Sequence, residues 1–300
     1  MVFLFVRLMP GDPLIVYMAG YDIERVNRIG PEEYQAMLHK WGLDLPIHVQ
    51  YWNWLAKLFQ GDLGQSIKLQ EDIGVLIAER MPRTAYLGLI SFVIGVFGGI
   101  AAGVICALRR GTWIDTVVTL LANTGITIPV FWLGILLMYI FAYKLGWLPT
   151  SGWTNPFDDF ALHVRQMIMP IICLSVGGIA GLCRLTRSCM LEVMRQDYVR
   201  TAWAKGLRER VIVVRHQIKN AMIPVVTALG GSLGAILGGS VLIENVFAIP
   251  GMGRLMVSAV FDQDYQVVQA QVLIFGGIII FSNLVVDIAW GWLDPRIRYA

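Results

Sequence analysis

The sequence contains few charged residues for its length. Only 15% of its 300 residues are Asp, Glu, Lys or Arg, and 56% are hydrophobic, whereas globular chains carry about 25% charged residues. The net charge is +3, and the basic residues stand at the borders of apolar stretches rather than among aromatic residues of polar segments. This composition excludes a soluble domain and gives no sign of nucleic-acid binding.

The sequence also lacks the motifs of an enzyme or a metal site. Its four cysteines lie in or beside apolar stretches and form no CxxC pair, so we interpret them as small buried side chains rather than disulfide or zinc ligands. It has no GxxxxGKS/T phosphate loop, no HExxH zinc motif and no GxSxG nucleophile motif. We therefore expect a chain without enzymatic activity, without a metal and without a cofactor of its own.

Five apolar stretches are long enough to cross a bilayer as helices, which takes about 20 residues. The segment Met1–Met9 is apolar but too short, and we expect it to be the end of a first transmembrane helix whose earlier turns precede this sequence. The sequence thus predicts an all-α polytopic membrane protein with an extracytoplasmic region at residues 10–84 and a transmembrane domain at 85–300. The five complete stretches are Ala85–Leu108, Val117–Tyr143, Met167–Cys183, Ala221–Ile243 and Val267–Trp292.

Small residues and prolines recur in these stretches. Ile94–Gly103 and Ala228–Gly239 carry small residues at every third or fourth position, which lets helix backbones approach closely in lipid. We expect close packing, rather than bending during a functional cycle, to be their main role. Pro129 and Pro170 each lack a backbone donor and should kink the helices that contain them.

Few polar side chains fall inside the apolar stretches. Asp287 stands about two turns before Arg296, so we prefer an ion pair with a basic residue or a partner subunit to a proton relay, although intramembrane charges are often functional. Glu244 is expected near the outer end of its stretch, in contact with water. The candidate polar groups of a path through the membrane are Asn123, Thr127, Asn283 and Asp287.

Basic residues predict which side faces the cytoplasm. Arg184–Asn220 holds nine Lys or Arg against three Asp or Glu, and the Arg109–Asp115 link and the C-terminal tail hold two arginines each. If the stretches alternate in direction, these three regions share one side. Pro10–Thr84, with seven basic and ten acidic residues, falls on the other. We therefore expect the C-terminus in the cytoplasm.

The segment between the third and fourth stretches is long, basic and helix-forming. Asp197 is the expected N-cap of a helix over Tyr198–Lys205, Gly206 ends that helix in the left-handed region, and Arg208–Lys219 forms a second helix. Two helices joined at a glycine and continuous with membrane spans would project as an elbow. A basic loop that binds anionic lipid headgroups is the alternative, but the apolar run Ala202–Ala204 favours a groove on a protein partner.

This segment resembles the cytoplasmic EAA loop of the permease subunits of ABC-type importers, in their dipeptide, oligopeptide and nickel branch. The family's loop has the form E-A-A-x3-G-x9-I-x-L-P and docks into a cleft on the ATPase subunit. Gly206 matches its glycine and Ala202 its second alanine, whereas other residues replace its first Glu and Ala and its final Ile, Leu and Pro. The resemblance implies that the coupling loop, at residues 190–220, acts through Asp197, Tyr198, Arg200, Thr201, Ala202, Ala204, Lys205, Gly206 and Leu207.

Further matches to this branch follow in order along the whole chain. Members usually begin with a full transmembrane helix before the first match, in line with the expectation for Met1–Met9. The matching segments are MPGDP at Met9–Pro13, GLDLP at Gly42–Pro46, GDLGQS at Gly61–Ser66, IENVFAIPGMG at Ile243–Gly253 and DPRIR at Asp294–Arg298.

The resemblance implies a type I importer permease in the bacterial inner membrane. A second related permease would complete the translocation path, two ATPase subunits carrying ATP and Mg would dock on the inner face, and an extracytoplasmic solute-binding protein would deliver the substrate. ATP binding would move the elbow and switch the spans between inward-facing and outward-facing states. The external contact would include residues 10–84 and the turn residues Pro250, Gly251, Gly253 and Arg254.

Three alternatives to a peptide importer stay open at this point. A nickel importer is the nearest, because nothing in the sequence discriminates the two substrates. A proton-coupled secondary transporter would use Asp287 and Glu244, although the sequence shows no internal repeat of the kind common in such transporters. A membrane scaffold without transport is the third.

Overall fold

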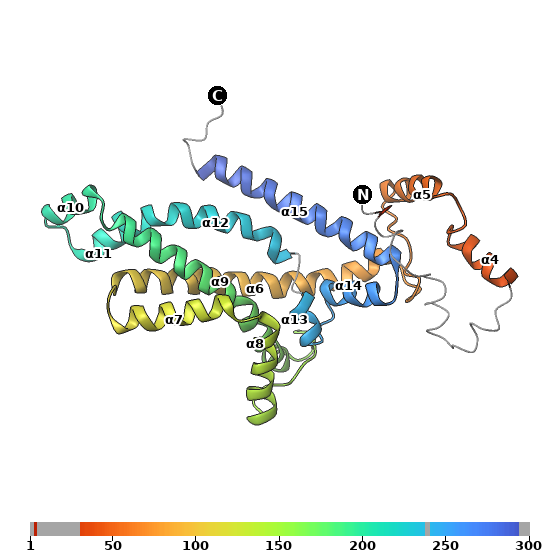
Figure 1. The fold of residues 1–300 in the computed structure, drawn as a ribbon, viewed down its shortest axis with the longest axis horizontal. Helices are drawn as coiled ribbons and strands as arrows, with labels where there is room; N and C mark the ends of the chain where they lie inside the picture. The colour runs from red at the N-terminus through yellow and green to blue at the C-terminus, as the bar shows by residue number, and fades with distance from the viewer. Residues whose placement is uncertain (1–2, 5–30, 238–240, 294–300) are drawn as a thin grey trace. The chain divides into compact units, whose positions relative to one another are not determined.

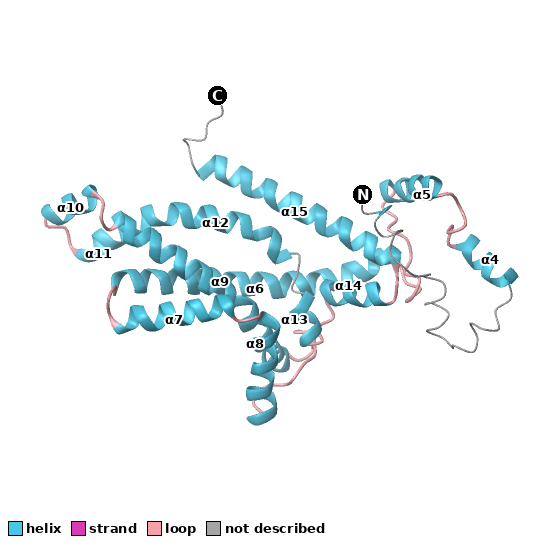
Figure 2. Cartoon of the chain, in the orientation of Figure 1, coloured by secondary structure: helices cyan, strands magenta, loops and turns pink. Residues whose placement is uncertain are grey.

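The computed structural model describes residues 3–4, 31–237 and 241–293 of the chain (Figure 1). Within these ranges the ordered elements are helices, and Figure 2 shows them joined by loops. The predicted all-α class is therefore confirmed. The helices are α4 Pro31–Lys40, α5 Ile47–Phe59, α6 Ile73–Leu108, α7 Trp113–Thr127, α8 Val130–Leu137, η1 Met138–Lys144, α9 Phe160–Val193, α10 Asp197–Ala204, α11 Glu209–Val211, η2 Ile212–Ile218, α12 Lys219–Leu237, α13 Val241–Val246, α14 Met252–Phe261 and α15 Tyr265–Leu293; η1 and η2 are π-helical.

The chain forms two compact units. Unit 1 comprises Met1–Arg83 and Pro250–Gly277, and unit 2 comprises Thr84–Ile249 and Ile278–Ala300. In unit 1, the start of α6 packs with α14 and the first turns of α15 around a core that includes Ile73, Met252 and Val267.

In unit 1 the GDLGQS segment, Gly61–Ser66, forms a turn a few residues before α6. The Asp62 carboxylate accepts the Gly64 backbone N–H at 2.8 Å, and Gly64, at φ +88°, adopts the left-handed region that favours glycine. The Ser66 hydroxyl donates to the buried Asp264 carboxylate, and the Gln65 N–H donates to Gln266 Oε1 at 3.2 Å. These bonds fasten the turn to the start of α15.

In unit 2 the long helix α9 is the central element and packs against α7, α8 and α12. It also meets the part of α6 that belongs to this unit at its small residues: a methyl group added to Gly95 would lie 3.7 Å from Gly178 Cα, and one on Gly99 only 2.6 Å from Leu182 Cβ. The close packing expected of Ile94–Gly103 is therefore confirmed. Residues 238–240 of the second small-residue run, Ala228–Gly239, lie outside the described residues.

Among the described residues, three helices are long and apolar enough to cross a membrane, or four if a bent pair counts as one span. The three lie in α6, α9 and α15, where spans are expected. The expected span Ala221–Ile243 includes residues 238–240, so part of it lies outside the described residues. Most of Met1–Met9 also lies outside them.

The expectation that Val117–Tyr143 crosses as one helix is wrong. Instead α7 and the combined α8–η1 helix meet at an angle of 107°. The cause is Pro129, which lacks an N–H and holds the preceding Ile128 in an extended conformation, at φ −69° and ψ 124°. The predicted kink at Pro129 is thus confirmed as a full break, whereas α9 continues through Pro170.

Candidate functional site: the elbow between α9 and α12

Residues 194–218 connect α9 to α12 and form a helical elbow. Its two arms are α10 and the continuous run of α11 and η2, which leads without interruption into α12. Figure 1 places α10 and α11 at the end of unit 2 where α6 also turns into α7. The sequence therefore predicted the arrangement of helix, glycine, helix and span correctly, although the second arm is largely π-helical.

Gly206 forms the hinge of the elbow through a Schellman motif. The Gly206 N–H bonds the Trp203 carbonyl at 2.9 Å, and the Leu207 N–H bonds the Ala202 carbonyl at 3.3 Å. Gly206 has φ +71°, and a methyl group built on it would meet no atom within 4 Å. The constraint at this position is therefore the backbone conformation, which disfavours L side chains, rather than lack of space.

The elbow has a small core of its own. Val199 and Ala202 of α10 and Ile212 of η2 are 1%, 5% and 0% exposed, and Val193 at the end of α9 packs against them. These contacts fix the two arms to each other. Ala202, predicted as a coupling residue, therefore supports the elbow from inside.

The opposite face of α10 and the hinge is exposed and combines aromatic and basic side chains. Tyr198, Trp203 and Leu207 are 42%, 50% and 39% exposed. The predicted N-cap is wrong by one position: Gln196 is the N-cap, and Asp197 is the first helical residue. The other predicted coupling residues on this exposed surface are Asp197, Arg200, Thr201, Ala204, Lys205 and Gly206.

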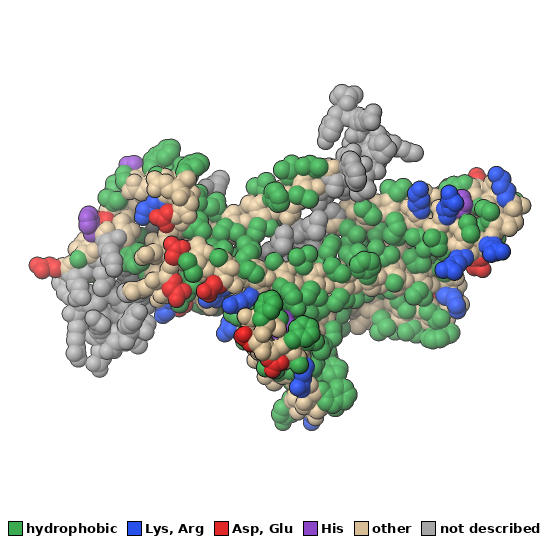
Figure 3. Space-filling model, turned by 180° about the vertical axis from the view of Figure 1, so that it is seen from behind, with side chains coloured by type: hydrophobic (Ala, Val, Ile, Leu, Met, Phe, Trp, Pro, Cys, Tyr) green, Lys and Arg blue, Asp and Glu red, His purple; other side chains and the backbone are tan. Residues whose placement is uncertain are grey.

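Basic side chains gather at this end of unit 2. Figure 3 shows Lys and Arg over the end formed by α10 and α11, and hydrophobic side chains along the neighbouring helices. Within α10, Arg200 Nη1 lies 3.6 Å from Asp197 Oδ1 and joins two highly exposed side chains, so this ion pair adds little stability. The surface is therefore positive and accessible, and it includes the exposed indole of Trp203.

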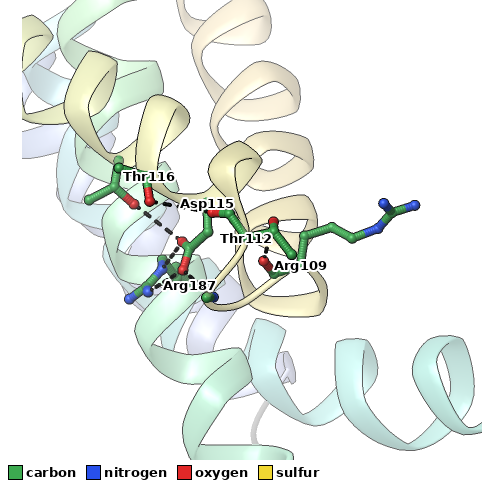
Figure 4. Close-up of polar contacts among 7 residues, drawn as sticks. Arg109, Thr112, Asp115, Thr116 and Arg187 are labelled. Atoms are coloured by element: carbon green, nitrogen blue, oxygen red, sulfur yellow. Dashed lines mark hydrogen bonds and ion pairs between the residues drawn. The ribbon is translucent and has the colours of Figure 1, made fainter.

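A buried ion pair beside the Arg109–Thr112 turn was missed by sequence reasoning (Figure 4). Arg187 of α9 binds Asp115 of α7 through two bonds, Nε to Oδ1 at 2.8 Å and Nη2 to Oδ2 at 2.9 Å. Asp115 is 6% exposed and also accepts the Gly111 N–H at 3.1 Å. The only sequence signal is an acidic residue in the first turn of an apolar helix. The pair fixes the start of α7 to α9.

Three of the four predicted path residues have described side chains, on α7 and α15. Asn123 and Thr127 lie together on α7, where the Thr127 hydroxyl donates to the Asn123 carbonyl. They line a shallow, open depression of the surface at the Pro129 bend. Asn283 is exposed on α15, and the side chain of Asp287 lies outside the described residues.

Glu244 is not in contact with water as predicted. It is 0% exposed, and the Thr84 hydroxyl of α6 donates to its Oε1 at 2.8 Å. The error arises because α13 is short and packs against α8 and α9, which covers a position that would face water at the end of an isolated helix. The bond links α6 to α13 inside unit 2.

The turn predicted to contact a solute-binding protein lies at the start of α14. Gly251 is the N-cap of α14, and both Gly251 and Gly253 are buried. Pro250 and Arg254 are half-buried, and the Pro250 carbonyl accepts a bond from Arg83 Nη1 at 3.2 Å. Only Pro250 and Arg254 of the four thus offer side-chain surface.

Sequence comparison relates the whole chain to membrane transport proteins. A family model described as the binding-protein-dependent transport system inner membrane component matches residues 99–299. The chain is 42% identical over 300 residues to a Brucella abortus (strain 2308) protein named as a peptide transport system permease protein. It is 41% identical over 299 residues to the glutathione transport system permease protein GsiC of Salmonella typhi. Each alignment covers 100% of this chain and 93% of the relative.

Two solved structures share the fold. An inward-facing form of the MetNI methionine ABC transporter aligns with a TM-score of 0.53 at 19% identity, over 71% of this chain and 95% of that chain. An amino acid ABC transporter with histidines aligns with a TM-score of 0.51 at 16% identity, over 75% and 95%. The family match, the relatives and the fold agree: the chain belongs to the binding-protein-dependent transport system inner membrane component family, the non-catalytic transmembrane subunits of ABC transporters.

Proposed function

We propose that this chain is the transmembrane subunit of an ATP-driven peptide importer, and that the elbow couples it to separate ATPase subunits. The observation that carries this proposal is the elbow itself. It presents Tyr198, Trp203 and Leu207 on an exposed basic surface, while Val199 and Ile212 fix its two arms from inside. A partner that pushes on this surface therefore moves α9 and α12 together.

The same surface supports an orientation. Basic side chains gather at the α10–α11 end of unit 2, and basic residues favour the cytoplasmic side. The elbow and the C-terminus would face the cytoplasm, where ATP is available. If the apolar stretches alternate in direction, residues 10–84 would face the other side of the inner membrane.

The proposed partners follow from this orientation. Two ATPase subunits would bind ATP and Mg and dock on the elbow. A second permease would complete the path, and lipid would cover the remaining apolar side chains. A solute-binding protein would approach unit 1 near Pro250 and Arg254, which are half-exposed beside the buried Gly251 and Gly253.

The proposed substrate class is small peptides. It rests on the relatives, of which one is named for peptide transport and another for glutathione, itself a modified tripeptide. A nickel importer is less well supported, because these relatives carry peptide names. Residues Asn123 and Thr127, at the α7 bend, are the described polar groups that we assign to the path.

Cysteine cross-linking tests the coupling role directly. The four natural cysteines are buried, so a thiol introduced by Trp203→Cys is the accessible one. We expect this thiol to cross-link to the ATPase subunits, and a thiol at Phe157, which is 95% exposed in unit 2 outside the elbow, to give no such product. An ATPase cross-link only from Phe157→Cys would contradict the proposal.

Uptake separates this function from the alternatives. Trialanine uptake should require the ATPase subunits and fail in cells that lack them. Uptake that persists without these subunits would favour a proton-coupled transporter, for which the buried Glu244 is the described candidate. Nickel uptake without peptide uptake would favour the metal importer.

A further inference from the structure

The turn between α6 and α7 presents two arginines that form no ion pair with another described residue. Arg109 and Arg110 follow directly after α6 and are exposed, and Figure 4 shows the Arg109 side chain extending away from α7 and α9. Asp115 is the only acidic residue between Thr84 and Lys144, and it binds Arg187 instead. The turn therefore carries two positive charges that its own helices leave unneutralised.

Hydrogen bonds hold the backbone of this turn in place. Gly111 takes φ +77°, and its N–H bonds the Asp115 carboxylate at 3.1 Å. The Thr112 hydroxyl donates to the Arg109 carbonyl at 2.6 Å. Because Asp115 also binds Arg187, the turn is tied to α9. The two arginines thus extend from a fixed base, so less order has to be imposed when they bind a partner.

An exposed apolar stripe begins beside the two arginines and runs along one face of α7. Its side chains are bulky, whereas helices that pack closely in membranes meet at small residues, as α6 does at Gly99. The stripe therefore suits the acyl chains of lipids rather than a closely packed helix. Its members, at spacings of three and four residues, are Trp113, which is 75% exposed, and the exposed Val117, Leu120 and Leu121.

The length of the stripe matches one leaflet of a bilayer. The helix rises about 12 Å from Trp113 to Leu121, and half of the hydrocarbon core of a bilayer is about 15 Å thick. Tryptophan favours the boundary between hydrocarbon and headgroups, so Trp113 marks the level at which the headgroups begin. Arg109 and Arg110, which precede Trp113, then lie at the level of the lipid phosphates.

We propose that the α6–α7 turn binds an anionic phospholipid, with Arg109 and Arg110 at its headgroup, Trp113 at the boundary and the α7 stripe along its acyl chains. A headgroup of net negative charge balances the two arginines, which a zwitterionic headgroup does not. The bound lipid would hold the start of α7 at the membrane surface and, through the Asp115–Arg187 pair, the adjoining part of α9. This inference requires only that the chain spans a membrane, and it depends on neither the substrate nor the ATPase.

Quenching by brominated lipids measures which lipid contacts Trp113. The purified full chain is reconstituted in phosphatidylcholine vesicles that contain a small fraction of brominated phosphatidylglycerol or of brominated phosphatidylcholine. Because the chain has ten tryptophans, the Trp113 signal is the difference between each chain and the same chain with Trp113→Phe. We expect a preference for phosphatidylglycerol of about five-fold for each arginine, the ratio that corresponds to one basic residue near an anionic surface.

Removal of two charges at either of two places gives a matched pair of variants. Arg109→Gln combined with Arg110→Gln should abolish the preference for phosphatidylglycerol at Trp113. Arg208→Gln combined with Arg210→Gln is the control, because it removes the same charge from two exposed arginines at the same end of unit 2 and leaves the turn intact. This control should keep the preference of the wild type.

Four results would overturn the proposal. The first two are equal quenching of Trp113 by the two brominated lipids and a preference that survives without Arg109 and Arg110. The third is a preference that falls equally in the Arg208 and Arg210 control, which would make it an effect of net charge alone. The fourth is loss of lipid quenching at Trp113 when the ATPase subunits are added, which would assign the turn to that partner. None of these measurements involves peptide uptake, so their failure would leave the proposed function untouched.

Discussion

The contact between α6 and α9 allows a quantitative test at Gly99. A methyl group on Gly99 would lie 2.6 Å from Leu182 Cβ and 2.9 Å from the Ile179 carbonyl oxygen, whereas carbon atoms in good contact lie about 3.5–4.0 Å apart. Two helices would have to separate by roughly 1 Å, since backbone and Cβ atoms cannot rotate away. Such overpacking typically costs about 1–3 kcal/mol. Gly99→Ala should therefore destabilise unit 2.

The higher helix propensity of alanine works in the opposite direction. It favours Ala over Gly by about 1 kcal/mol in a helix interior, and this gain would hide part of the clash in a single variant. Gly177→Ala on α9 provides the control, because its methyl group would meet no atom within 4 Å. Propensity cancels between the two variants, so Gly99→Ala should be less stable than Gly177→Ala by about 1–3 kcal/mol.

Thermal unfolding of the purified chain in detergent, followed by tryptophan fluorescence, measures this difference. Gly103→Ala should behave like Gly99→Ala, since its methyl group would lie 2.6 Å from Thr186 Cβ. Gly95→Ala should be tolerated, because its nearest contact would be an ordinary 3.7 Å. Equal melting temperatures for the Gly99, Gly95 and Gly177 variants would refute the argument that glycine is required for helix approach.

Three further predictions concern the polar contacts and the hinge of unit 2. Asp115→Asn leaves Arg187 without its charged partner. Breaking a buried pair typically costs about 3–5 kcal/mol of folding stability, and we expect the lower end of this range because the arginine is partly exposed. Arg187→Met in the same chain should recover stability in a thermal melt, and a double variant no more stable than Asp115→Asn would argue against the pair. Gly206→Val and Gly206→Pro should abolish peptide uptake and coupled ATP hydrolysis while membrane insertion stays intact, because neither residue fits φ +71°. Normal peptide uptake by these variants would exclude a coupling role for the turn at Gly206. Thr84→Val removes the hydroxyl that donates to buried Glu244 and should lower stability by about 1–3 kcal/mol. Thr84→Ser keeps the hydroxyl and should keep the stability. Equal melting temperatures for the two variants would show that this hydrogen bond adds no stability.

The features that sequence predicted best are local ones. The break at Gly206 follows from the lack of a side chain, and the break at Pro129 from the lack of an N–H, and both need only neighbouring residues. The close approach at Ile94–Gly103 was also predictable, since small residues have few other uses at that spacing in an apolar helix.

The features that sequence could not predict are pairings between distant residues. Asp115 and Arg187 are 72 positions apart, and only the packing of α7 on α9 shows that they meet. Glu244 illustrates the same limit: its burial depends on elements that pack around α13.

In the coupling role that we propose for the elbow, the turn at Gly206 would transmit movement rather than absorb it. A flexible connection would dissipate a push on Trp203, but Gly206 is held by two hydrogen bonds of its Schellman motif, and Val199 and Ile212 close the angle between the arms. The glycine therefore serves a sharp, fixed turn rather than free rotation. Because the second arm is continuous with α12, and α12 packs along α9, a displacement of the elbow must tilt both helices or break its core.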